Sequence, residues 1–236
     1  MISDLDDLVG YAADRFSQPI IIVGHSWGSV LGSLYAARHP ERIAGYVGIG
    51  QGVDFQASES MASQAAQKLA REAGKEDDAA KIETLYQTWV KTPVGTDDFD
   101  FRAFMEFRSL TTRYLDPNAT AGLLSALVSP DLGWNDVRWQ LMQLTNPSEW
   151  IRVQQPLLKA LPALSPPESF SVPVAFIHGT NDYVTSLELA VAYQERVSAP
   201  VSTLFLVEGL GHMLMVDDPV AFAKALREAV EFLGVR

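Results

Sequence analysis

Residues 19–28 read Pro-Ile-Ile-Ile-Val-Gly-His-Ser-Trp-Gly, and a helical pattern follows them directly. The apolar run Ile20–Val23 is typical of a strand that is covered on both faces in a parallel sheet. Ser26 has one glycine two residues before it and another two residues after it. At a strand-to-helix junction, such a serine can be held on a sharp, strained turn with its hydroxyl exposed above the sheet. The stretch therefore predicts a nucleophile elbow at Ser26.

Strands and helices alternate on both sides of this elbow. One helix is predicted before it, over Leu5–Phe16, and another after it, as far as Pro40. Further strands are predicted over 43–49, 172–177 and 201–207, with helices over 187–197 and 219–233. The pattern indicates an α/β fold with about four parallel strands and flanking helices. We expect Gly28 and Gly32, four residues apart, to let the helix after the elbow approach the sheet closely.

The alternation stops in the middle of the chain, where only helical patterns are found. They are predicted over 54–73, 76–91, 99–114, 118–128, 134–144 and 147–160, with glycine or proline breaks between them. The chain is thus predicted to have a core made of residues 1–52 and 168–236, interrupted by a helical insertion over 53–167. A lid over a binding site is one interpretation of such an insertion, and a separate helical domain with its own core is the other.

Two later loops carry the residues that a serine nucleophile needs. A serine hydroxyl requires a base within hydrogen-bond reach and a carboxylate that holds this base in the correct tautomer. Asp182 follows the third predicted strand, and His212 lies in a glycine-flanked loop after the fourth. The alternative acids, Asp217 and Asp218, lie at the entrance of the last helix and are better interpreted as helix caps.

The composition limits the partners of the chain. It has 236 residues, with 18 Lys and Arg against 29 Asp and Glu, for a net charge of −11. This balance argues against binding to nucleic acid or to anionic membranes, because both require a basic surface. No apolar run approaches the ~20 residues of a membrane span, and the N-terminus is acidic, so a cytoplasmic location is expected. There is no cysteine, and the four scattered histidines show no metal-ligand spacing, so we expect neither a metal nor a cofactor.

The sequence resembles the α/β-hydrolase superfamily and is similar to prolyl iminopeptidase-like hydrolases. The matching stretches are 24–29, 37–43, 178–182 and 209–212, and the resemblance covers nearly the whole chain. The resemblance implies that Ser26 is the nucleophile, Asp182 the orienting acid and His212 the general base. It also implies that the backbone N–H of Trp27 donates to the oxyanion, and that the helical insertion is a cap over the pocket.

The sequence departs from the family pattern before the elbow. Family members carry more chain there, including the first strands and an HGG-type loop that gives a second oxyanion donor, and this sequence has no matching stretch. Loss of one such donor typically costs ~10²–10³ in turnover. The strand over 20–23 is therefore expected at a sheet edge, where a homo-oligomeric contact, a rearranged terminus or another polypeptide would cover it. Met1 being an internal start of a longer natural protein is a further alternative.

The expected function is the hydrolysis of small esters or amides through an acyl-enzyme, with an esterase favoured over an aminopeptidase. An aminopeptidase would need carboxylates aimed at the substrate amine, and Glu106, Glu149 and Glu168 are the candidates, although each also fits a solvated surface. Trp27, Phe104 and Met213 are the predicted substrate-binding residues, and the aromatic residues Trp134, Trp139 and Trp150 are further candidates that fit a core equally well.

Other activities of the same fold are weighed by the residue at the elbow. By resemblance, epoxide hydrolases and haloalkane dehalogenases use an aspartate there, so Ser26 argues against both. A cofactor-free haloperoxidase or a carbon–carbon hydrolase stays open. The alternative from another class is a weakly active or inactive fragment that acts as a binding module.

Overall fold

The computed structural model describes residues 1–92, 94, 96, 98–116, 132–145 and 165–235. The chain forms two compact units, one made of Met1–Ser58 and Ser165–Arg236, the other of Glu59–Leu164. The predicted helices over 118–128 and 147–160, with Glu149 and Trp150, lie outside the described residues.

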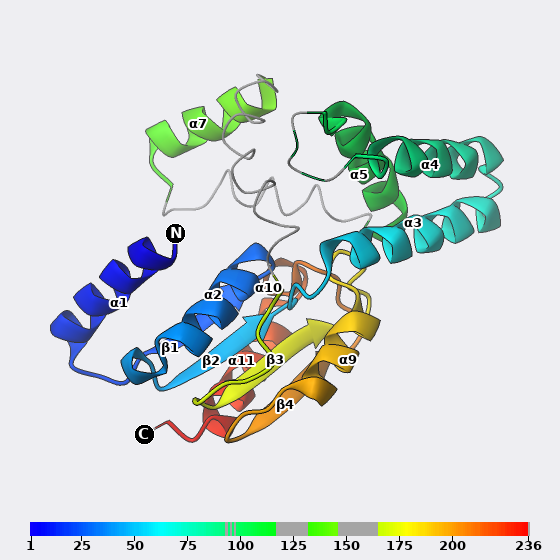
Figure 1. The fold of residues 1–236 in the computed structure, drawn as a ribbon. Helices are drawn as coiled ribbons and strands as arrows, with labels where there is room; N and C mark the ends of the chain where they lie inside the picture. The colour runs from blue at the N-terminus through cyan, green and yellow to red at the C-terminus, as the bar shows by residue number, and fades with distance from the viewer. Residues whose placement is uncertain (93, 95, 97, 117–131, 146–164, 236) are drawn as a thin grey trace. The chain divides into compact units, whose positions relative to one another are not determined.

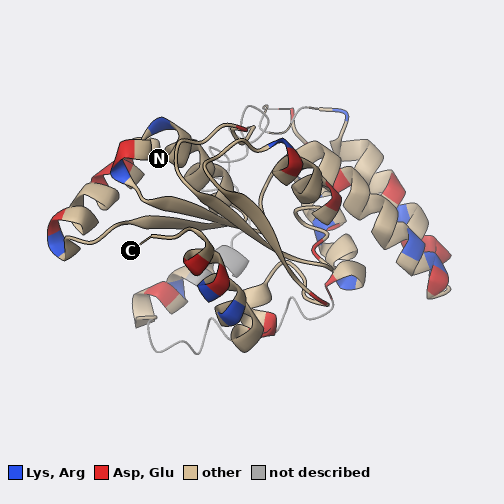
Figure 2. Cartoon of the chain, turned by 90° about the horizontal axis from the view of Figure 1, so that it is seen from below, with Lys and Arg blue, Asp and Glu red and all other residues tan. Residues whose placement is uncertain are grey.

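The first unit is built on a sheet of four parallel strands (Figure 1). The strands are β1 (Ile21–His25), β2 (Gly45–Ile49), β3 (Val174–Gly179) and β4 (Ser202–Val207), and they lie in the order β1-β2-β3-β4. The four predicted strands are thus confirmed, and the strand before the elbow is at an edge of this sheet, as expected. The four strands contain no charged residue, whereas Lys, Arg, Asp and Glu are found along the helices (Figure 2).

Helices cover both faces of this sheet. They are α1 (Ile2–Phe16), α2 (Trp27–Arg38), α9 (Leu187–Arg196), the short α10 (Leu214–Asp217) and α11 (Pro219–Phe232), with a 3₁₀ turn over Pro40–Arg42. Alternate residues of the central strands point to opposite faces. Tyr46 and Phe176 join the core that contains residues of α1, α2 and α9, whereas Val47 and Ile177 join the core that contains residues of α10 and α11.

The close approach of α2 to the sheet depends on one of the two expected glycines. A Cβ atom at Gly32 would lie 2.8 Å from Cε2 of Tyr46 and 3.1 Å from Cγ2 of Ile22. A Cβ atom at Gly28 would meet nothing within 4 Å. The expectation is therefore confirmed for Gly32 and wrong for Gly28. The reason is that the Cβ position of Gly28 faces open space, whereas its carbonyl oxygen faces Gly24 of β1.

The described part of the second unit is helical. It contains most of α3 (Phe55–Glu72), α4 (Glu76–Trp89), α5 (Phe101–Leu115) and α7 (Trp134–Thr145), which confirms four of the predicted helices. Trp89 is fully buried and contacts Phe104 edge-on, with the ring centroids 5.2 Å apart. Phe107 packs tilted on the same indole. This unit therefore has an aromatic core of its own, made by α4 and α5.

Candidate active site

Ser26 lies in a strained backbone conformation between β1 and α2. Its φ of 55° and ψ of −120° are unusual for a residue with a side chain, and such conformations cost ~1–3 kcal/mol. Its backbone N–H donates to the carbonyl oxygen of Ile49 at the end of β2, over 2.9 Å. A Cβ atom at Gly24 would lie 2.2 Å from the carbonyl oxygen of Gly28, so the turn can close only over a glycine at this position.

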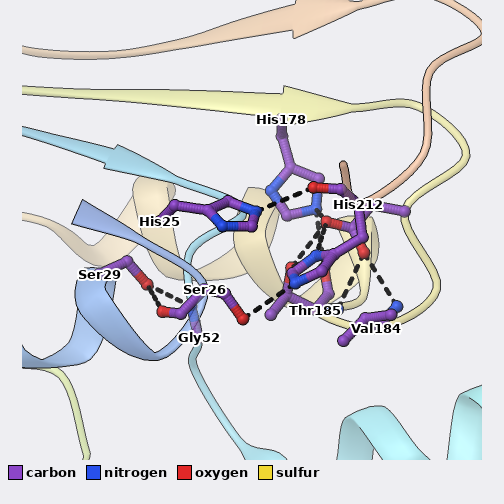
Figure 3. Close-up of polar contacts among 9 residues, drawn as sticks. His25, Ser26, Ser29, Gly52, His178, Val184, Thr185 and His212 are labelled. Atoms are coloured by element: carbon purple, nitrogen blue, oxygen red, sulfur yellow. Dashed lines mark hydrogen bonds and ion pairs between the residues drawn. The ribbon is translucent and has the colours of Figure 1, made fainter. Parts of the chain in front are cut away.

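A buried network of hydrogen bonds connects this turn to β2 and to the loop after it. The Ser29 hydroxyl donates to the carbonyl oxygen of Ser26 and accepts from the backbone N–H of Gly52, over 2.9 Å in the second case (Figure 3). The Tyr46 hydroxyl lies 2.7 Å from the carbonyl oxygen of Ser29 and 2.8 Å from Oε1 of Gln51. The network ties the loop after β2 to the elbow, and so helps to hold Ser26 in its strained conformation.

His212 is hydrogen-bonded to Ser26 through one ring nitrogen (Figure 3) and to Asp182 through the other, so the three residues form a continuous chain of hydrogen bonds. Nε2 of His212 lies 2.9 Å from Oγ of Ser26, and Nδ1 of His212 lies 2.8 Å from Oδ2 of Asp182. The three residues follow the carboxyl ends of β1, β4 and β3, which parallel pairing brings to one edge of the sheet. The structure thus brings together the three residues that the sequence predicts as nucleophile, base and acid.

The carboxylate of Asp182 is buried and has donors on both oxygens. Oδ1 accepts from the backbone N–H groups of Val184 and Thr185, over 2.9 and 3.0 Å. Oδ2 accepts from the Thr185 hydroxyl over 2.8 Å, in addition to His212. Burial by itself raises the pKa of Asp182, but the hydrogen bond and charge of His212, with smaller contributions from His178 and the backbone N–H of Thr185, lower it to about 2. The carboxylate is therefore ionised at neutral pH and holds the proton on Nδ1 of His212.

The loops that carry Asp182 and His212 are bonded to each other. The backbone N–H of Gly209 donates to the Thr180 hydroxyl over 2.8 Å, and the side-chain amide of Asn181 donates to the carbonyl oxygen of Gly209 over 3.1 Å. A Cβ atom at Gly179 would lie 2.3 Å from the carbonyl oxygen of Leu210, so the two loops also meet closely at a glycine. These contacts hold the two loops together in addition to the hydrogen bond between Asp182 and His212.

Two further histidines, His25 and His178, lie at this site. Nε2 of His25 donates to the carbonyl oxygen of His212 over 2.9 Å, and the two rings are 4.7 Å apart. Nε2 of His178 donates to the carbonyl oxygen of Thr185 over 2.7 Å. Burial lowers the pKa of both His25 and His178, so both are neutral donors to backbone carbonyls. The prediction that neither is the base agrees with this geometry, but their contacts were not predicted, and neither were those of Thr185.

The alternative acids lie elsewhere. The Asp218 side chain accepts from the backbone N–H groups of Val220 and Ala221, so it caps α11 as predicted. Asp217 is the last residue of α10 and does not occupy the cap position, so that part of the prediction is wrong. Leu214–Asp217 instead forms a separate helical turn that ends directly before the cap residue of α11.

The remaining predicted residues are placed as follows. Trp27 is the first residue of α2, where backbone N–H groups have no acceptor within the helix, and Met213 directly follows His212 and precedes α10. Phe104 is buried in the aromatic core of the helical unit, whereas Trp134 and Trp139 are exposed.

Glu106 forms an ion pair with Lys81, and Glu168 forms one with Arg196, on exposed surfaces in both cases. Among the described residues, no cluster of three or more His, Asp or Glu could hold a metal. The helices of the described part include none with the length and hydropathy of a membrane span.

Comparisons with known proteins agree with this fold. A protein of Bacillus subtilis (strain 168) named Probable aminopeptidase YbaC is 24% identical over 229 residues, which are 95% of this chain and 70% of that protein. The crystal structure of VinJ matches with a TM-score of 0.62 at 17% identity, over 98% of this chain and 71% of that one. A mutant of an epoxide hydrolase from Bacillus megaterium matches with a TM-score of 0.53 at 15% identity, over 98% and 74%. At these identities the two structures show a shared fold alone. A family model described as the alpha/beta hydrolase fold matches residues 4–219, and the chain therefore belongs to the alpha/beta hydrolase family.

Proposed function

We propose that this protein is a serine hydrolase that cleaves small esters or amides through an acyl-enzyme. The observation that carries the proposal is the unbroken chain of hydrogen bonds from Oγ of Ser26 through His212 to Asp182. A hydroxyl held 2.9 Å from an imidazole nitrogen can lose its proton to that nitrogen as it attacks. The strained backbone at Ser26 keeps the hydroxyl at the edge of the sheet, where a substrate can reach it.

The reaction follows from this geometry in two halves. In the first, Ser26 Oγ bonds to the substrate carbonyl carbon while Nε2 of His212 takes the hydroxyl proton. The tetrahedral oxyanion is stabilised by the N–H of Trp27 and the positive end of α2. His212 then gives its proton to the departing alcohol or amine, and the acyl group stays on Ser26. In the second half, water attacks the acyl-enzyme, His212 takes one of its protons, and Ser26 leaves with that proton restored.

Esters are the favoured substrates over amides. Ester cleavage requires only the nucleophile, the base and an oxyanion donor, and the bacterial relative named an aminopeptidase supports amide cleavage as a second activity. Recognition of a substrate amine would need an unpaired carboxylate, whereas Glu106 and Glu168 are already held by Lys81 and Arg196. We assign Trp27 and Met213 to substrate binding because they adjoin Ser26 and His212 in the chain. The helical unit is proposed to act as the cap.

The proposal is tested by activity and by labelling of the purified chain. We expect hydrolysis of p-nitrophenyl acetate, faster than that of a proline p-nitroanilide, and covalent labelling by a fluorophosphonate. We expect Ser26→Ala to abolish both turnover and labelling. The matched control is Ser33→Ala, because Ser33 lies on the same helix and donates its hydroxyl to the carbonyl oxygen of Val30. A wild-type chain that is folded but neither turns over ester nor reacts with fluorophosphonate would favour the binding module instead.

A further inference from the structure

Thr185 contacts both oxygens of the Asp182 carboxylate. Its hydroxyl donates to Oδ2 over 2.8 Å, and its backbone N–H donates to Oδ1 over 3.0 Å. The same hydroxyl oxygen lies 3.4 Å from Nδ1 of His212, so it is next to the hydrogen bond between acid and base (Figure 3). Only 9% of the surface of Thr185 is exposed, so water does not compete for these hydrogen bonds.

The contacts of Thr185 restrict how the carboxylate can turn. The N–H groups of Val184 and Thr185 occupy Oδ1, so rotation of the carboxyl group would break two hydrogen bonds. The Thr185 hydroxyl donates to one lone pair of Oδ2, and the other lone pair stays free to accept from Nδ1 of His212. Hydrogen bonds to an ionised acceptor are roughly twice as strong as neutral ones, so this restriction is effective.

Thr185 is itself held by the end of a central strand. His178 follows Ile177 in β3, and its fully buried imidazole donates to the carbonyl oxygen of Thr185 over 2.7 Å. Nε2 of His178 also lies 3.6 Å from Oδ2 of Asp182, so the imidazole packs along the acid loop. A chain of contacts therefore leads from the sheet through His178 and Thr185 to Asp182.

We propose that Thr185 is a positioning residue for the hydrolysis reaction, whose side-chain hydroxyl aims Oδ2 of Asp182 at Nδ1 of His212. The role rests on the proposed serine hydrolase function, since it acts through acid and base and does not touch the substrate. It differs from a merely structural role in one respect: it depends on the hydroxyl and not on the shape of the side chain.

Two substitutions at Thr185 separate the hydroxyl from the shape. Thr185→Val keeps the shape and the backbone donor but removes the hydroxyl, whereas Thr185→Ser keeps the hydroxyl and removes the methyl group. We expect Thr185→Val to lower kcat about tenfold with KM unchanged, the effect of one lost charge-assisted hydrogen bond. Thr185→Ser should retain most of the activity. Thr111→Val is the matched control, because Thr111 is a buried threonine of the helical unit whose hydroxyl bonds to the carbonyl oxygen of Phe107.

A second measurement does not depend on activity. In protein labelled with ¹³C at the aspartate carboxyl, Thr185→Val should raise the pKa of Asp182 by about one unit, with no such shift in Thr185→Ser or Thr111→Val. Equal losses of kcat in the valine and serine variants would overturn the proposal, as would an unchanged pKa in Thr185→Val. If the wild-type chain lacks hydrolase activity, the proposed function fails, and the ¹³C titration still decides whether the hydroxyl holds Asp182.

Discussion

The two glycines of the elbow motif are equivalent in sequence but should respond oppositely to substitution by alanine. A Cβ atom at Gly24 would lie 2.2 Å from the carbonyl oxygen of Gly28, 2.6 Å from its carbonyl carbon and 2.9 Å from Cα of Ser29. All three are backbone atoms of the turn and cannot rotate away as a side chain would. At Gly28, an added Cβ would meet nothing within 4 Å, and its φ is not positive.

The size of the effect follows from these distances. Favourable contacts between heavy atoms lie near 3.5 Å, so Gly24→Ala forces the turn open by about 1 Å. Overpacking of this kind costs ~1–3 kcal/mol of stability, and a shift of ~1 Å in a reacting group costs ~10²-fold in rate. Gly28→Ala should keep full activity, and it gains up to ~1 kcal/mol because alanine is favoured over glycine inside a helix.

The assay combines urea unfolding with ester hydrolysis and fluorophosphonate labelling of both variants. We expect Gly24→Ala to lose about 100-fold in kcat/KM and to label slowly, while Gly28→Ala unfolds at the same or a higher urea concentration than the wild type. The reasoning is refuted if the two variants lose activity equally, or if Gly24→Ala retains wild-type activity and stability.

Three further outcomes are expected. The pKa of Asp182 is lowered from 3.8 to about 2 in the folded state, so its ionised form contributes about 2 kcal/mol to the free energy of unfolding. This contribution is present above pH ~4 and is lost as the pH falls towards 2. The free energy of unfolding of Asp182→Asn should therefore depend less on pH in this range. Arg108→Met should lower the free energy of unfolding in urea by ~3–5 kcal/mol, because the Glu59 carboxylate, which is 2% exposed and 2.6 Å from the guanidinium, then stays buried without its partner. Adding Glu59→Gln should recover part of this loss, and strictly additive losses would contradict the prediction. As purified, this 236-residue chain should self-associate through the edge strand β1, where Val23 is 47% exposed. Light scattering should give more than the monomer mass and Val23→Lys should lower it, whereas a monomeric wild type would contradict this.

The residues of the candidate site could be predicted from the sequence because each has a local signature. The elbow is recognised by glycines around Ser26, and Asp182 and His212 are found because each follows an apolar run that forms a strand. Parallel pairing then brings the three strand ends to one edge, and this step needs no knowledge of the side-chain packing. The order of the elements was therefore sufficient to identify these residues.

The surroundings of these residues could not be predicted, because they depend on contacts between distant segments. Thr185 could have been noticed as a hydroxyl three residues after an aspartate, which is a common local hydrogen-bonding pattern, but its approach to His212 depends on the packing of two loops. Phe104, predicted as a substrate-binding residue, is instead buried in the aromatic core of the helical unit, and its sequence context could not tell these two positions apart. A buried aromatic residue on an amphipathic helix has the same spacing whether it lines a pocket or packs on Trp89, and only the fold decides between them.

The three histidines near Asp182 explain why a single imidazole is suited to be the base. If His25 or His178 were protonated, its charge would oppose the imidazolium that the proposed mechanism forms on His212 when Ser26 loses its proton. Burial lowers the pKa of His25 and of His178, and each uses its Nε2 proton on a backbone carbonyl. Both are thus neutral donors that hold the two loops, and His212 alone among the three has its Nε2 within reach of the Ser26 hydroxyl. Histidine therefore has two roles at this site: His25 and His178 donate to backbone carbonyls, and His212 is the proposed base. The burial of each ring and the direction of its Nε2 distinguish the two roles.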